Sequence, residues 1–284
     1  MRFLNGRRGT VLLRLPLNRS AATPATPATP AKADETGAAE VASLLRQAAA
    51  EAIGTGFRVA AVIGSGIAAA RLSPGNLGLQ LLENSVATGA ALAALVVALQ
   101  PVSAAFNPLV TVLERIFGAL TTAETLTLIT AQVAGGAVGA VVANLMFGLP
   151  ALTLAGTTRT GAGLWLGEVV ATVGLLLVIF GATRAGRGGQ VGYLVGAYIT
   201  AAYWFTSSTS FANPAVTLAR TLSDTFAGIA PGSAPMFLLM QLLGGGLAYA
   251  LIRVLYPAPP MIAATIADTA VDAAPPSPRS EVHR

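Results

Sequence analysis

The sequence Thr209-Ser210-Phe211-Ala212-Asn213-Pro214-Ala215-Val216-Thr217-Leu218-Ala219-Arg220 decides how the rest of the chain is interpreted. Asn-Pro is a strong signal for the start of a helix. Asparagine caps the first turn through its side chain, and proline at the first helical position gives up a donor that has no partner there. A short helix is therefore expected at residues 214–224. It would begin only a few residues after a long apolar segment that ends near Phe205.

A second stretch, Phe106-Asn107-Pro108-Leu109-Val110-Thr111, shares this pattern. Both copies read Asn-Pro-x-Val-Thr, and both follow an apolar segment. We call Asn107-Pro108-Leu109 the first box and Asn213-Pro214-Ala215 the second box. The first box predicts another short helix at residues 108–118.

Composition indicates a polytopic helical membrane protein, because 54% of the 284 residues are hydrophobic and only 10% are charged. The chain has no cysteine, and its single histidine is His283. We therefore expect no disulfide, metal or cofactor, and no enzyme activity, since no nucleophile–base pair is visible. The net charge of +5 lies mostly near the N-terminus without interleaved aromatic residues, which argues against nucleic-acid binding.

Six apolar segments are expected to cross the membrane. Most have a length close to the roughly 20 residues that a helix needs to span a bilayer. The fifth is shorter and must extend into its polar neighbours. The six segments are residues 48–70, 77–100, 121–147, 161–180, 191–205 and 234–255. The predicted domain covers residues 44–256. Residues 1–43 and 257–284 are predicted to be disordered cytoplasmic tails, and a transit peptide is the alternative for the first of them.

The distribution of positive charge predicts the orientation. If the N-terminus is inside, the inner regions hold thirteen Lys and Arg residues and the outer regions hold three. Both termini are then cytoplasmic, in the cell membrane.

The two halves of the chain repeat. Glu51 and Glu168 lie early in the first and fourth segments, and a Gln-x-x-Gly-Gly pattern begins at Gln132 in the third and at Gln241 in the sixth. Three segments per half is an odd number, so the second half must be inverted in the membrane. Inverted repeats with helices broken at the midplane are a common way to build a central pathway.

Inversion brings the two short helices in from opposite sides. Each would be roughly 16 Å long at 1.5 Å per residue, so that their N-termini meet near the membrane centre. Two helix N-termini carry partial positive charge and should repel cations, while the Asn107 and Asn213 amides offer donors to a neutral solute. The pattern predicts a pore for small uncharged polar solutes.

These features resemble the aquaporin/glycerol-facilitator (major intrinsic protein) family over roughly residues 44–256. The resemblance implies an all-α fold with six transmembrane helices, two re-entrant half-helices and an inverted 3+3 repeat. It also implies a homotetramer in the lipid bilayer and a loop-supporting role for Glu51 and Glu168, for which a proton relay is the alternative.

Two departures from the family pattern concern the pore. Leu109 stands where the family usually has alanine, and Val216 stands where it has the arginine of the outer filter. Spacing from the boxes predicts a constriction made of small residues, which are Ala87, Ala201, Ser210 and Val216. Such a wide constriction resembles bacterial members associated with arsenic resistance, which pass arsenous acid or related solutes, rather than a dedicated water channel. The competing function is a secondary transporter, which is disfavoured because no carboxylate is expected near the boxes.

Three charged residues need separate hypotheses. Arg220 is interpreted as a solvated residue at a helix end rather than a displaced filter arginine. Arg58 and Glu83 lie inside apolar segments, where a lone charge costs at least about 2.5–3.5 kcal/mol. One hypothesis is that they pair with each other. The other is that Arg58 faces a subunit interface while Glu83 faces water.

Overall fold

The structure is a computed structural model that describes residues 30–257, and all of its regular structure within that range is helical. The helices are α1 (Pro30–Leu72), α2 (Leu77–Leu99), α3 (Pro108–Ile116), α4 (Thr122–Met146), α5 (Ala162–Arg184), α6 (Val191–Phe205), α7 (Pro214–Arg220) and α8 (Ala234–Leu255). A short 3₁₀ helix, Gly188–Gln190, leads directly into α6.

Five of these helices are long and apolar enough to cross a membrane, namely α1, α2, α4, α5 and α8. Helix α6 has only 15 residues. The sequence predicts that this short segment extends into its polar neighbours on either side. The 3₁₀ turn lengthens it at its start, but the helix still ends at Phe205. The six predicted segments thus correspond to six helices.

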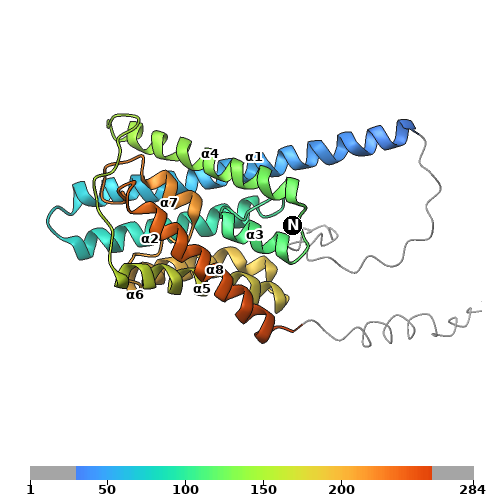
Figure 1. The fold of residues 1–284 in the computed structure, drawn as a ribbon. Coiled ribbons are helices and arrows are strands. Elements are labelled where there is room, and N and C mark those ends of the chain that lie inside the picture. The colour runs from blue at the N-terminus through green and yellow to red at the C-terminus, as the bar shows by residue number, and fades with distance from the viewer. Residues whose placement is uncertain (1–29, 258–284) are drawn as a thin grey trace, which may run out of the picture.

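Two boundaries differ from the sequence prediction. Helix α1 begins at Pro30, so the chain from residue 30 to 43, predicted to be a tail, is helical (Figure 1). The rest of the two predicted tails, residues 1–29 and 258–284, lies outside the described residues. The half-helices α3 and α7 are also shorter than expected, with 9 and 7 residues, because turns replace their last predicted residues.

The packing follows the internal repeat. Helix α1 lies against α4 in the first half, and α5 lies against α8 in the second, while α2 pairs with α6 across the two halves (Figure 1). Glycines permit these close approaches. A Cβ on Gly89 of α2 would lie 2.7 Å from the Gly196 carbonyl oxygen of α6, and one on Gly196 would lie 2.5 Å from the Gly89 oxygen. The half-helices α3 and α7 fill the space that the long helices enclose, with α3 packed on α4 and α8 and α7 packed on α4, α1 and α8.

Candidate pore at the junction of the two boxes

Each box caps a half-helix as its sequence predicts. The Asn107 side chain accepts from the Leu109 N–H at 3.0 Å, and the Asn213 side chain accepts from the Ala215 and Val216 N–H groups at 3.0 and 3.2 Å. Both asparagines have extended backbone, with φ of −158° and −159°, and a proline follows each of them at the start of the helix.

The two boxes meet, as expected from the inverted repeat. The Asn107 amide Nδ2 donates to the Ala212 carbonyl oxygen at 2.9 Å, and the Asn213 Nδ2 donates to the Phe106 carbonyl oxygen at 2.6 Å. The residue before each asparagine, Phe106 or Ala212, has a left-handed backbone with φ of 46°. This strained turn aims the carbonyl of each half at the asparagine of the other.

Two buried carboxylates hold these turns in place. Glu51 of α1 accepts from the Ala105 and Phe106 N–H groups at 2.8 and 2.7 Å. In the second half, Glu168 of α5 accepts from the Phe211 and Ala212 N–H groups at 2.9 Å each. A carboxylate that accepts two backbone N–H groups supports the loop backbone, which is the arrangement implied by the family resemblance.

The glutamines of the two Gln-x-x-Gly-Gly patterns connect each glutamate to its half-helix. Gln132 Nε2 donates to Glu51 at 2.8 Å and to the Thr111 hydroxyl at 2.9 Å. Gln241 Nε2 likewise donates to Glu168 at 2.6 Å and to the Thr217 hydroxyl at 2.8 Å. The two networks match residue for residue, and this shows that the repeat is structural as well as sequential.

Leu109 of the first box is buried and turned toward α8. Its Cδ2 atom would lie 3.5 Å from a Cβ placed on Gly245, so that this glycine leaves room for the larger side chain. The departure from alanine at this position is therefore absorbed by packing between α3 and α8.

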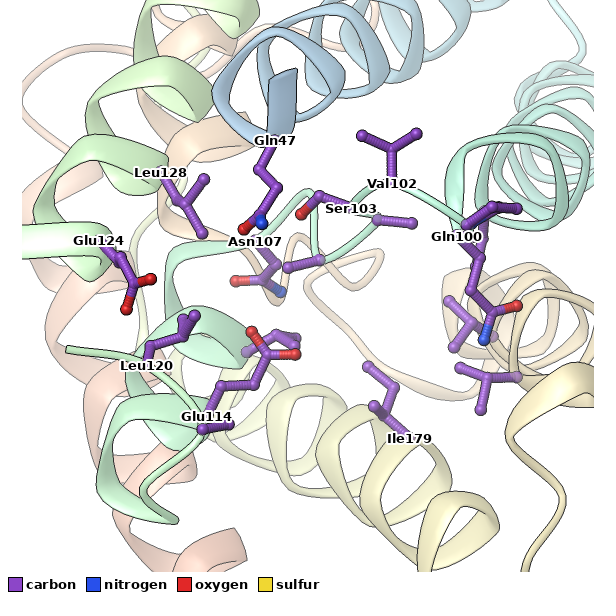
Figure 2. Close-up of a pocket in the computed structure, with 18 of the residues that line it drawn as sticks. Gln47, Gln100, Val102, Ser103, Asn107, Glu114, Leu120, Glu124, Leu128 and Ile179 are labelled. Carbon is purple, nitrogen blue, oxygen red and sulfur yellow. The ribbon is translucent and has the colours of Figure 1, made fainter. Parts of the chain in front are cut away.

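A cavity of about 390 Å³ adjoins the junction and is lined by residues of six helices together with Asn107 (Figure 2). Glu114 of α3 points into this cavity in Figure 2. The expectation that no carboxylate lies near the boxes is therefore wrong. Glu114 follows Asn107 by seven residues, which is about two helical turns, so the two residues lie on the same face of α3. This spacing could have predicted that the Glu114 carboxylate lies on the same side as Asn107.

The four residues predicted to form the constriction differ in burial. Ser210 and Val216 are buried close to the second box, whereas Ala87 and Ala201 lie at exposed positions. Their neighbours Thr88 of α2 and Tyr203 of α6 are buried instead, and the Tyr203 hydroxyl donates to the Thr88 Oγ1 atom at 3.4 Å. The assignment of Ala87 and Ala201 to the constriction stays a prediction, with Thr88 and Tyr203 as competing positions.

The interpretation of Arg220 as a solvated residue is wrong, because its side chain is only 2% exposed. Its guanidinium carbon lies 3.4 Å from the centroid of the Phe211 ring, and its Nε donates to the Ala227 carbonyl oxygen. Arg159 lies 5.3 Å from the centroid of the same ring. Loop carbonyls and an aromatic face thus replace water around Arg220.

The proposed pair of Arg58 and Glu83 is also not formed. The Glu83 carboxylate accepts from the Ser73 hydroxyl at 2.6 Å. Arg58 instead donates from Nη1 to the Phe106 carbonyl oxygen at 3.4 Å, which places it at the junction of the boxes. The alternative hypothesis, that Arg58 faces a subunit interface, is wrong as well, because the side chain is only 5% exposed.

Comparison with known proteins agrees with this geometry. The model of the major intrinsic protein family matches residues 38–210, more than half of the chain. The chain is 49% identical over 229 residues to Aquaglyceroporin AqpS of Rhizobium meliloti (strain 1021), with 80% of this chain and 97% of that protein covered. The X-ray structure of the aquaglyceroporin from Plasmodium falciparum superimposes with a TM-score of 0.56 at 17% identity, over 74% of this chain and 95% of that one, and shows the shared fold.

Two interlocked boxes, matched carboxylate networks and these similarities lead to one assignment: the chain belongs to the major intrinsic protein family.

Proposed function

We propose that this chain is a passive membrane channel for small uncharged polar solutes of the glycerol or arsenous acid type, with exclusion of ions. The observation that carries the proposal is the reciprocal pair of hydrogen bonds between the boxes, Asn107 to Ala212 and Asn213 to Phe106. Irregular backbone at membrane depth is tolerated where it is buried or lines a polar path, and here it meets a cavity. The similarity to an aquaglyceroporin supports a solute larger than water.

The interlocked boxes also favour a channel over a secondary transporter. A transporter built on inverted repeats moves one half against the other. Such a motion would break both hydrogen bonds between the boxes, which link the two halves at the centre of the fold. Glu114 and Glu124 both supply carboxylates to the cavity, together with Arg46 and Arg58, but within residues 30–257 these groups are not arranged as a coupling-ion site.

Flux into reconstituted vesicles tests this function. We expect vesicles that contain the chain to pass glycerol and arsenous acid with a low activation energy and without saturation. Water flux should be measured in parallel, and empty vesicles are the control. Saturating flux that follows a cation or proton gradient would favour the transporter instead.

A substitution at Val216 tests the position after the second box. Val216 belongs to a buried apolar cluster that includes Val59 and Ile63 of α1. Its N–H donates to the Asn213 side chain, so that it lies within one turn of the junction. We expect Val216→Arg to reduce glycerol flux by about tenfold, since the bulk of an added guanidinium side chain narrows the passage, while water flux falls less. Val216→Leu is the control for size. If folded Val216→Arg protein passes glycerol at the rate of the wild type, Val216 is not part of the constriction.

We also propose that the channel is a homotetramer in the cell membrane, with both termini in the cytoplasm. Membership of the family supports the assembly, and the thirteen inner against three outer basic residues support the orientation. The mass of the particle in lipid nanodiscs and the accessibility of terminal tags in intact cells would test the two parts separately.

A further inference from the structure

Arg58 is a buried cation at the junction of the two boxes. It lies in the middle of α1, is only 5% exposed, and lines the same cavity as Asn107. The Phe106 carbonyl oxygen that it contacts also accepts the amide of Asn213. Its Nε atom has no hydrogen-bond partner within the described part of the chain. The guanidinium therefore keeps unused donors next to the central hydrogen bonds.

The carboxylates nearest to Arg58 in α1 and α2 are engaged elsewhere. Glu51 accepts from the loop backbone and from Gln132, and Glu83 accepts from Ser73. The N-termini of the two half-helices add further positive potential at the same place. A guanidinium stays charged at any physiological pH. Glu114 and Glu124 line the same cavity, whereas Arg58 contacts the junction itself through the Phe106 carbonyl. Arg58 thus adds positive charge at the junction of the two boxes.

The internal repeat shows that the fold itself does not need an arginine at this place. Arg58 follows Glu51 by seven residues, and Leu175 follows Glu168 by seven residues. Leu175 is 1% exposed and lines the same cavity from α5. In the second half of the molecule, leucine fills the position that Arg58 occupies in the first half.

Two other arginines, the buried Arg220 and the half-buried Arg159, bond to the loops. Arg220 Nε donates to Ala227, and Arg159 Nε donates to the Gly228 carbonyl oxygen at 2.9 Å. Arg58 differs, since its one described hydrogen bond is long and its Nε is free. Elsewhere in the bundle, the Tyr203 hydroxyl is bonded to Thr88. Of these three arginines, Arg58 is the one that lines the cavity beside Asn107.

We propose that Arg58 is a selectivity residue of this channel and takes over the role that Val216 cannot perform. This inference rests on the proposed channel function. The guanidinium donates hydrogen bonds to the oxygen atoms of uncharged solutes with several hydroxyl groups, and its charge repels cations and protons. The filter charge is thus carried by α1 beside the boxes and not by α7 after the second box.

The test uses the full chain in vesicles, with Arg58→Leu as the main variant because it copies Leu175. Proton and potassium leaks are followed with a pH-sensitive dye under a potassium diffusion potential, and glycerol and water fluxes are followed by light scattering. We expect Arg58→Leu to raise the cation leak by about tenfold or more and to lower the ratio of glycerol to water flux by about tenfold, the size expected when a hydrogen bond to a charged group is lost. Arg58→Lys should keep cations out but lower the glycerol ratio, since the planar donor fork is lost.

Arg71→Leu is the matched control. Arg71 lies on the same helix and also donates to a backbone carbonyl, that of Phe147 at 2.7 Å, but it is exposed at the helix end. Its loss should change neither the cation leak nor the flux ratio.

Each outcome decides between the hypotheses. If Arg58→Leu keeps both the cation barrier and the flux ratio of the wild type, Arg58 is not a selectivity residue. If both Arg58→Leu and Arg58→Gln fail to fold, the residue is a structural anchor of the Phe106 carbonyl and the proposal is equally overturned. If wild-type vesicles pass no uncharged solute at all, the proposed channel function fails instead.

Discussion

Glu51→Leu is expected to prevent the chain from reaching a stable folded state. The Glu51 carboxylate accepts from two backbone N–H groups, from the Ser103 hydroxyl at 2.5 Å and from Gln132. Leucine accepts nothing, so the Ala105 and Phe106 N–H groups and the Ser103 hydroxyl would lose their acceptor, while Gln132 would keep only Thr111. Each buried unsatisfied donor costs about 1–3 kcal/mol. The sum is comparable with the whole stability of a typical domain, which is about 5–15 kcal/mol.

The measurement is the fraction of monodisperse protein in detergent and its thermal midpoint. Glu83→Leu is a matched control, because Glu83 is also a glutamate inside an apolar segment but accepts one hydrogen bond, from Ser73. Glu83→Leu should lower the monodisperse fraction and the thermal midpoint only slightly. Glu51→Gln should fall between the two, since its carbonyl oxygen still accepts while its NH₂ group faces the remaining donors. A stable Glu51→Leu protein would show that Glu51 does not support the loop.

The internal repeat explains why the architecture could be predicted from sequence. Each repeated feature, whether box, glutamate or glutamine, occurs twice, and the odd number of segments per half requires inversion. The structure places both copies in matching hydrogen-bond networks around the junction. The match to the family model supports the same fold.

Spacing along the chain could not fix the rotation of each helix about its axis. One residue corresponds to 100° of rotation, so that a shift of one position exchanges a buried side chain for an exposed one. Ala87 and Thr88 differ in this way, since the first is exposed and the second is buried. The lengths of α3 and α7 were overestimated for a similar reason, because the helix ends depend on turns that pack against other loops.

The partners of buried arginines also could not be predicted. Arg220 is stabilised by the Ala227 carbonyl and the Phe211 ring, and Arg58 contacts the Phe106 carbonyl. Backbone carbonyls carry no signature in the sequence, so the sequence indicated only a charged side chain of the next segment, Glu83, as a partner for Arg58. The family resemblance gave no guidance here, since it assigns no role to Arg58.

Gly139→Ala is expected to destabilise the protein by about 1–2 kcal/mol, because it forces α1 and α4 apart. A Cβ on Gly139 would collide with the carbonyl oxygen of Gly56 in α1. That atom is backbone and cannot rotate away, so the helices must separate, and overpacking of this kind typically costs about 1–3 kcal/mol. Alanine also favours the helix by about 1 kcal/mol over glycine, which offsets part of the cost.

The same substitution at Gly246 of α8 should have the opposite sign. A Cβ there meets no atom within 4 Å, so only the helix propensity remains and Gly246→Ala should be neutral or slightly stabilising. Gly136→Ala should lie between them, since its nearest neighbour, the Ala219 Cβ, is 3.3 Å away. Thermal midpoints of the three variants in one detergent would give this order. Equal midpoints for Gly139→Ala and Gly246→Ala would show that the contact between α1 and α4 adapts at little cost. The close approach of these two backbones would then not be what stabilises the first half.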